Sequence, residues 1–255
     1  MNQPSAVALF LFAGLLAVNS IASAKDDRIC EMRTYFAAPG KLENLHARFR
    51  DHTTKLFEKH GMTNIGYWVP LDNPDNKLIY ILAYPNKEAR DKSWKAFIAD
   101  PDWVKAKADS EKGGTLVAKA EAVFLNATDY SPEVKASTDG ERVFELRTYT
   151  TTPGNLNRLH ARFRDHTLKL FEKHGMTNIG YWSPVAGEKG EENTLIYILA
   201  HKSPAEAKAS FDGFRQDPAW VSARKASEEG AGGSLTEKDG VKSVFMKATD
   251  YSTIK

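Results

Sequence analysis

The sequence contains a single cysteine and no long run of charges of one sign in its 255 residues. One cysteine excludes a disulfide framework and the paired-cysteine motifs of redox and zinc sites. The 35 basic and 33 acidic side chains nearly cancel, which excludes a strongly basic nucleic-acid-binding protein and an acidic tail. Also absent are a glycine-rich phosphate loop, a serine nucleophile elbow, an EF-hand loop and a recognisably spaced carboxylate pair. The 42% hydrophobic content is sufficient for a packed core.

Residues 1–24 have no charged side chain and read as a secretory leader. The apolar stretch from Ala6 to Val18 is too short to span a hydrocarbon core of about 30 Å as a helix. The small-residue pattern Ala22-Ser23-Ala24 follows it and predicts cleavage after Ala24. We therefore expect an exported protein, periplasmic or secreted, with no stable membrane span once the leader is removed. The alternative is a buried N-terminal helix or an uncleaved anchor.

The rest of the chain consists of two tandem copies of one sequence unit. Residues 31–68 and 145–182 are identical at 30 of 38 aligned positions, at an offset of 114. The match resumes in later segments and ends with Ala-Thr-Asp-Tyr-Ser at residues 127–131 and 248–252. Such a repeat predicts two similar domains, each large enough for its own core. Their expected bounds are residues 25–131 and 142–255, with a polar linker at 132–141.

Each copy predicts the element order strand, helix, strand, strand, helix, strand. In the first copy, residues 29–36 alternate as a strand does, and Pro39-Gly40 opens a helix that ends at Gly61. Strands follow at 62–69 and 78–84, then a helix from Asn86 and a closing strand at 121–126. The βαββαβ order is the ferredoxin-like arrangement, an α+β fold with both helices on one face of an antiparallel sheet.

The same residues carry a resemblance to a known family. The strand Glu-(Met/Leu)-Arg-Thr-Tyr, the Pro-Gly helix start, the helix end Lys-His-Gly, the strand Gly-Tyr-Trp and the Asp-Pro-x-Trp element occur in order, in both copies. They resemble the NIPSNAP family of the dimeric α+β barrel superfamily. The resemblance implies that two tandem ferredoxin-like units pair as a barrel within one chain. Superfamily relatives include haem-handling enzymes and cofactor-independent monooxygenases, so membership does not fix the activity. No motif in the sequence indicates a cofactor.

Three histidines of the first helix recur in the second copy. They are His46, His52 and His60, matched by His160, His166 and His174. On an α-helical wheel all three fall on or beside the apolar face, and no two have the i, i+4 spacing of a helical zinc site. His60 precedes the glycine cap and favours the helix dipole. The other two are either hydrogen-bonded beneath the helix or edge a cavity as a base, ligand or haem contact. We expect no metal site.

The first strand of each copy offers a second candidate site. Its alternate residues are Glu31, Arg33 and Tyr35, and in the second copy Glu145, Arg147 and Tyr149. Because the intervening residues are more apolar, we expect the apolar set beneath the helices and the Glu-x-Arg-x-Tyr set inside the barrel. Two interpretations remain: an internal ion pair, or a polar pocket for an anionic or aromatic ligand. Trp68 and Trp182 are candidate aromatic walls, with core packing the alternative. Arg48, Arg50 and Asp51 are expected to be solvent-facing.

Two functional hypotheses follow from these features. In the first, the protein binds a small molecule in the barrel or between helices and sheet, with cofactor-independent oxidation or haem handling as the reactions that the resemblance allows. In the second, it is a non-enzymatic interaction or structural module that recognises a partner through loops such as residues 185–193. Neither involves nucleic acid, and oligomerisation beyond the intrachain pair is left open.

Overall fold

Both halves of the chain fold into the same series of elements. The computed structural model describes residues 28–137, 140 and 142–255, so the expected leader and its cleavage site lie outside the described residues. The first unit comprises β1 (Ile29–Ala37), α1 (Leu42–Arg48), η1 (Phe49–Thr53), α2 (Thr54–Lys59), β2 (Thr63–Pro70), β3 (Lys77–Tyr84), α3 (Lys87–Ala99), α4 (Pro101–Ser110) and β4 (Val117–Ala127). The second comprises β5 (Val143–Thr151), α5 (Leu156–Arg162), η2 (Phe163–Thr167), α6 (Leu168–Lys173), β6 (Thr177–Pro184), β7 (Thr194–His201), α7 (Pro204–Gln216), α8 (Pro218–Glu229) and β8 (Thr236–Ala248).

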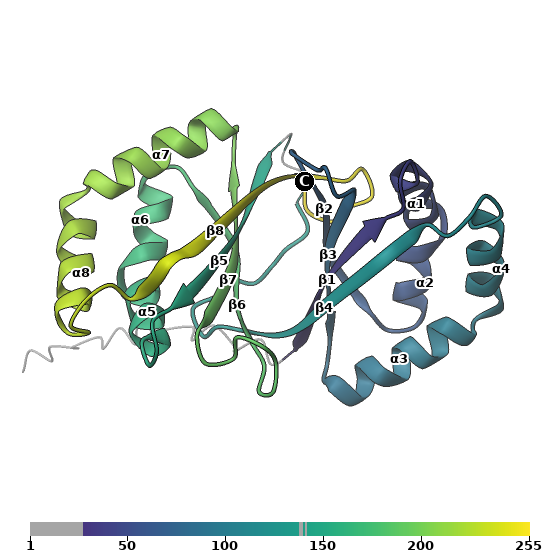
Figure 1. Cartoon of the computed structure of the whole chain (residues 1–255), viewed down its shortest axis with the longest axis horizontal. Coiled ribbons are helices and arrows are strands. Elements are labelled where there is room, and N and C mark those ends of the chain that lie inside the picture. The colour runs from purple at the N-terminus through teal and green to yellow at the C-terminus, as the bar shows by residue number, and fades with distance from the viewer. Residues whose placement is uncertain (1–27, 138–139, 141) are drawn as a thin grey trace, which may run out of the picture.

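The eight strands close into one antiparallel barrel in the order β1-β3-β2-β8-β5-β7-β6-β4. Each unit contributes four adjacent strands, and the units join edge to edge where β2 pairs with β8 and where β4 pairs with β6. The helices of the two units lie on opposite outer sides of the barrel (Figure 1). The predicted fold, two tandem ferredoxin-like units forming an intrachain α+β barrel, is confirmed.

The barrel interior is a packed apolar core built from both units. Cys30, Trp68 and Ile81 of the first unit meet Phe144, Trp182 and Ile198 of the second in a single buried cluster. An eight-stranded barrel is just wide enough for side chains to fill, and here they do. Cys30 is thus a small core residue. The cavities described below lie outside this cluster.

Two further apolar layers are present, one in each unit, between the half-barrel and the helices that cover it. In the first unit, Phe49 and Phe57 of the helical segment pack on Tyr67 and Tyr80 of the sheet. The equivalent rings in the second unit repeat this packing. In the described ranges, no helix is long and apolar enough to cross a membrane.

A π-helical turn interrupts the first helix of each unit, at Phe49–Thr53 and Phe163–Thr167. Thr53 Oγ1 donates to the Arg48 carbonyl at 3.1 Å, which supplies a backbone oxygen in this turn with a donor. A π turn contains more residues than an α turn and rotates the residues after it relative to an ideal wheel. His52 and His166 are exposed in consequence, and not beside the apolar face as the wheel predicted.

Candidate functional site

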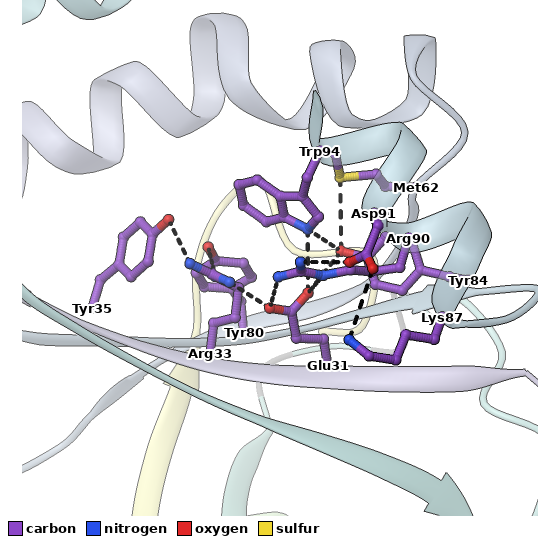
Figure 2. Close-up of polar contacts among 10 residues, drawn as sticks. All are labelled: Glu31, Arg33, Tyr35, Met62, Tyr80, Tyr84, Lys87, Arg90, Asp91 and Trp94. Atoms are coloured by element: carbon purple, nitrogen blue, oxygen red, sulfur yellow. Dashed lines mark hydrogen bonds and ion pairs between the residues drawn. The ribbon is translucent and has the colours of Figure 1, made fainter. Parts of the chain in front are cut away.

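The prediction that Glu31, Arg33 and Tyr35 face the barrel interior is wrong. Cys30 belongs to the barrel core and Met32 packs against it, so the alternate residues point into the layer beneath the helices (Figure 2). The barrel interior offers apolar side chains from eight strands, whereas the covering helices bring polar partners. A buried charge is stable only where it is paired, so the charged side chains of this strand lie on the side that faces the helices. The correction holds equally for Glu145, Arg147 and Tyr149.

The Glu31 carboxylate is fully buried and saturated with donors. It accepts from Arg90 Nη2 at 2.7 Å and Nε at 3.0 Å, from Trp94 Nε1 at 3.2 Å, from Tyr84 Oη at 3.1 Å and from Arg33 Nη1. Figure 2 shows these groups converging on it from β1, β3 and α3. Burial alone would raise the pKa of Glu31, but hydrogen bonds and charges from Arg90 and Arg33 outweigh it and hold this pKa below its usual value. Glu31 is therefore ionised at neutral pH.

Arg33 completes this network. Its Nε donates to Tyr80 Oη at 3.0 Å, and its guanidinium lies over the Trp94 ring at 4.4 Å. Burial opposes the charge of Arg33, yet the neighbouring tyrosines and Glu31 raise its pKa above the usual value. Carboxylate and guanidinium therefore neutralise each other inside the chain. These contacts support the ion-pair interpretation of this face.

The second unit keeps the strand ion pair and changes its helical partners. Glu145 accepts from Arg147 and from Ser243 Oγ, and His201 Nε2 lies 3.1 Å from its Oε2. Ala207 and Phe211 occupy the positions in the second unit that are equivalent to Arg90 and Trp94 of α3. The pKa of Glu145 is again lowered, because His201 and Arg147 outweigh burial. The common part of the two sites is thus the Glu-x-Arg-x-Tyr pairing itself.

A cavity of about 420 Å³ lies between the sheet and the helices of the first unit. We call it the helix–sheet cavity. Tyr35 is the candidate residue from the sequence that lines it. Its other walls are aromatic or long polar side chains: Arg48, Phe49, Thr53, Phe57, Trp94, Phe97, Ile98, Trp103, Lys107, Glu111, Thr115, Val117 and Ala120. The space combines stacking surfaces with charged groups, as ligand pockets do.

Arg48 is buried in the wall of this cavity, contrary to the predicted solvent-facing position. Helix α4 packs along the flank of α1, so the Arg48 guanidinium stacks on Trp103 at 5.2 Å and donates to Glu111 at 2.8 Å. Its Nε is buried and has no hydrogen-bond partner. A helical wheel of one segment cannot show which flank a later helix covers. By contrast, Arg50 and Asp51 are exposed as predicted.

His60 forms a structural link between two helices. As predicted for a residue before the glycine cap, it ends α2, and its Nε2 lies 2.7 Å from Asp100 Oδ2. The other oxygen of Asp100 caps α4 by accepting from the Asp102 amide. The second unit repeats this with His174 and Asp217.

His46 and His160 lie in two clefts at the junctions between the units. His46 Nδ1 is 2.8 Å from Tyr251 Oη, and His160 Nδ1 is 2.8 Å from Tyr130 Oη. In each pair the histidine and the tyrosine come from opposite units. Burial lowers the pKa of both histidines, so both are neutral at pH 7. Both histidines are hydrogen-bonded, and both also line a cleft, so the structure combines the two positions that the sequence offered as alternatives.

Comparison with known proteins agrees with this architecture. A family model described as NIPSNAP matches residues 30–132 and again residues 144–252. The chain belongs to the NIPSNAP family. No curated protein matches the sequence.

Solved structures with little sequence identity share the barrel of this NIPSNAP protein. A putative monooxygenase from Fusobacterium nucleatum is 10% identical with a TM-score of 0.58, covering 87% of this chain and 92% of its own. One from Lactobacillus acidophilus is 14% identical with a TM-score of 0.53, covering 88% and 97%. An anthrone oxidase-like protein is 12% identical with a TM-score of 0.53, covering 91% and 96%. At these identities the likeness concerns the fold alone.

Two of the candidate residues of this NIPSNAP protein belong to the barrel core. Trp68 and Trp182 are almost fully buried in the central cluster and line none of the cavities described here. Their indoles lie over Gly66 and Gly180 of the same strands. The core-packing alternative therefore describes both tryptophans.

No histidine is among the residues that line the helix–sheet cavity, whereas Tyr35, a residue type that can hold haem iron, does line it. Nor does any cluster of three metal-ligating side chains occur in the part of the chain that the structure describes. The sequence did not predict several residues that contact the candidate residues. These are Arg90 and Trp94 beside Glu31, and Tyr130 and Tyr251 beside the histidines. The tyrosines had a usable signal, since they stand in the repeated Asp-Tyr-Ser segment.

Proposed function

We propose that the first unit binds an aromatic molecule with an oxygen acceptor in the helix–sheet cavity. The observation that carries this proposal is the buried Arg48, whose partner-free Nε lies in the wall of an aromatic-lined space of about 420 Å³. An unmet buried donor costs about 1–3 kcal/mol, which a phenolic, carbonyl or carboxylate oxygen would recover. Trp94, Trp103 and Tyr35 supply ring surfaces for a planar ligand.

The charges around the cavity favour an anionic form of that ligand. Arg48 and Lys107 oppose one acidic residue in the lining, Glu111, with which Arg48 is already paired at 2.8 Å. The cavity therefore carries a net positive charge from its lining. A phenolate or aromatic carboxylate fits it better than an aromatic amine.

The names of the structural neighbours suggest the reaction class to test, an oxidation by dioxygen. Anthrone and 2-naphthoic acid serve as probes, the first for turnover and the second for binding. Oxygen uptake with anthrone above the uncatalysed rate would support an oxidase. Binding of 2-naphthoate without oxygen uptake from anthrone would limit the proposal to a binding protein.

The location of the binding site can be tested by introducing a large side chain that occupies the helix–sheet cavity. Ala120 is exposed and lines the cavity, so Ala120→Phe should occlude it without altering the core. We expect calorimetry to show one 2-naphthoate per chain, and binding at least about tenfold weaker in this variant. Val241→Phe is the matched control, because Val241 pairs with Tyr149 on β5 as Ala120 pairs with Tyr35 on β1.

The role of Arg48 has a control in the second unit. Arg48→Met should weaken 2-naphthoate more than a neutral naphthalene, whereas Arg162→Met removes the equivalent buried arginine away from the cavity. Equal binding in wild type and Ala120→Phe would refute the proposed site. If no aromatic probe binds and changes in residues 185–193 weaken capture of a protein partner, the interaction-module hypothesis takes its place.

We further propose that the protein is exported and cleaved after Ala24. The apolar, uncharged leader in residues 1–24 supports this. N-terminal sequencing of the protein from the culture medium or the periplasm should begin at Lys25. An intact N-terminus in the membrane fraction would indicate an uncleaved anchor instead.

A further inference from the structure

Two clefts lie on opposite seams of the barrel, one at each junction between the units. The first, here the Val69 cleft, has a volume of about 370 Å³ and lies where β2 meets β8. The second, the Ser183 cleft, has a volume of about 490 Å³ and lies where β6 meets β4. In each cleft a histidine of one unit lines the space and is hydrogen-bonded to a tyrosine of the other unit.

The two clefts share one frame. In the Val69 cleft His46 pairs with Tyr251, and Arg50 pairs with Asp250. In the Ser183 cleft the equivalents are His160 with Tyr130 and Arg164 with Asp129, the latter joined by bonds of 2.7 and 2.8 Å. Because each arginine is neutralised by its aspartate, neither frame offers a free cation to a ligand.

The clefts differ at three positions that all line the space. The Val69 cleft has Glu43, Val69 and Lys247, and the Ser183 cleft has Asn157, Ser183 and Asn126 at the equivalent places. The register confirms the equivalence on the strands, since Val69 lies opposite Lys247 and Ser183 opposite Asn126. Two charges and a methyl-bearing side chain are thus replaced by two amides and a hydroxyl.

In the Ser183 cleft these changes complete a hydrogen-bonded series. Ser183 Oγ lies 3.3 Å from His160 Nε2, and His160 Nδ1 lies 2.8 Å from Tyr130 Oη. A hydroxyl, an imidazole and a third group that orients the imidazole form the arrangement of an activated nucleophile. In the Val69 cleft the imidazole and the tyrosine are present, but valine occupies the place of the hydroxyl.

We propose that Ser183 and His160 form a nucleophile–base pair that hydrolyses small uncharged carboxylic esters. Ser183 Oγ attacks the ester carbonyl carbon while its proton passes to His160 Nε2. The bond from that carbon to the alcohol oxygen then breaks, and the departing oxygen takes the proton from His160. Water then gives a proton to His160 Nε2 as its oxygen attacks the acyl carbon. The bond from that carbon to Ser183 Oγ breaks, Oγ takes the proton back from His160, and the carboxylic acid leaves.

The neighbouring groups suit these steps. Asn126 lies directly across the strand pair from Ser183, so their side chains share one face of the sheet. Asn157 precedes His160 by three residues on α5, so these two side chains share one face of the helix. Both line the cleft, and side-chain amides of this kind stabilise the oxyanion of acyl transfer. Tyr130 acts as a positioning residue: when its oxygen accepts a hydrogen bond from Nδ1–H, Nε2 carries no proton and is free to act as the base.

The protonation states support the same assignment. Burial lowers the pKa of His160, so the ring is neutral and able to accept a proton at pH 7. Burial also raises the pKa of Tyr130, which therefore stays a neutral phenol. The groups facing the ring are Asp129 and Arg164, which offset each other, together with Tyr130 and Ser183. Activity should fall as the pH drops through the lowered pKa of His160.

The experiment uses purified protein, 4-nitrophenyl acetate and a fluorophosphonate probe. We expect the probe to add once per chain at Ser183, located by peptide mass spectrometry. Ser183→Ala and His160→Gln should each lower the ester hydrolysis rate by about 100-fold or more. His46→Gln is the matched control and should leave the rate unchanged. Tyr130→Phe should lower kcat and shift the pH profile while leaving KM near the wild-type value.

A gain of function gives a second, independent test. The triple change Glu43→Asn, Val69→Ser and Lys247→Asn should create a second labelled serine, at position 69. Because it adds a signal, this outcome does not depend on a variant failing to fold. Labelling of wild type that is absent, or that persists unchanged in Ser183→Ala, would overturn the proposal. Neither result bears on the helix–sheet cavity, where binding is measured separately with 2-naphthoate.

Discussion

Replacing Glu31 with alanine is expected to lower the free energy of unfolding by about 3 kcal/mol or more. The substitution leaves Arg33 and Arg90 without the carboxylate that both contact beneath the helices. Arg90 is partly exposed and already contacts Asp91, so it can turn towards solvent. Arg33 cannot do so as readily, because it lies between Tyr80 and Trp94. Urea denaturation followed by tryptophan fluorescence measures the loss.

The second unit supplies the comparison for this prediction. Glu145→Ala should cost less than Glu31→Ala, because it leaves one arginine, Arg147, without its carboxylate, whereas Glu31→Ala leaves two. Asp109→Ala breaks the exposed pairs with Lys105 and Lys112 and should cost far less than Glu31→Ala, because solvent screens these charges. Equal losses at Glu31 and Asp109 would show that the buried network contributes no special stability.

The same carboxylates predict how stability depends on pH. The pKa of Glu31 and that of Glu145 are both lower in the folded protein than their ordinary value of 4.5. Their contribution is therefore complete above that value and is lost as the pH falls through the folded pKa. Wild type should lose stability more steeply below pH 4.5 than the Glu31→Gln and Glu145→Gln double variant. Parallel curves for the two proteins would contradict the assignment.

The second large effect is expected at Gly66, on the barrel side of β2. A Cβ at this residue would lie 2.5 Å from Cζ2 of Trp68, which is fully buried in the core of the barrel. Gly66→Ala should destabilise the protein by about 2–3 kcal/mol, because the indole has no free space to move into. Gly180→Ala should cost as much, since its Cβ would lie 2.6 Å from Cζ2 of Trp182.

A double-mutant cycle isolates this contact. Trp68→Ala alone should cost about 3–5 kcal/mol by leaving a cavity in the barrel. In that background Gly66→Ala should cost almost nothing, giving a coupling energy of about 2 kcal/mol. Gly113→Ala is the control, because its Cβ would meet only the flexible end of Lys41. Additive effects of Gly66→Ala and Trp68→Ala would disprove the steric explanation.

Much of the fold could be predicted because its signals are local and occur twice. Strand alternation, the Pro-Gly starts, the glycine after His60 and the repeat itself depend on neighbouring residues. The candidate sites were harder to predict than the fold. Glu31 and Arg33 lie on a strand that is covered on both faces, so their side chains could point to either face. Relative apolarity gave the wrong face, since it ignores the partners Arg90 and Trp94 that α3 brings from 60 residues away.

The helical candidates show the same limit. His52 lies on the apolar side of an ideal wheel, but the π turn at Phe49–Thr53 moves it into solvent. Arg48 lies on the polar side of that wheel, yet α4 covers it with Trp103. Hydrophobic periodicity describes one helix in isolation, whereas burial depends on every element that packs against it.

Local residue patterns are sufficient to predict the family, the two units and the order of their strands and helices. Those properties depend on residue patterns that repeat within short windows. The tertiary structure decided that the barrel interior is filled, that a cavity remains under the first unit's helices, and that His160 meets Ser183 and Tyr130. These last three residues lie on α5, on β6 and just beyond β4, so only closure of the barrel brings them together.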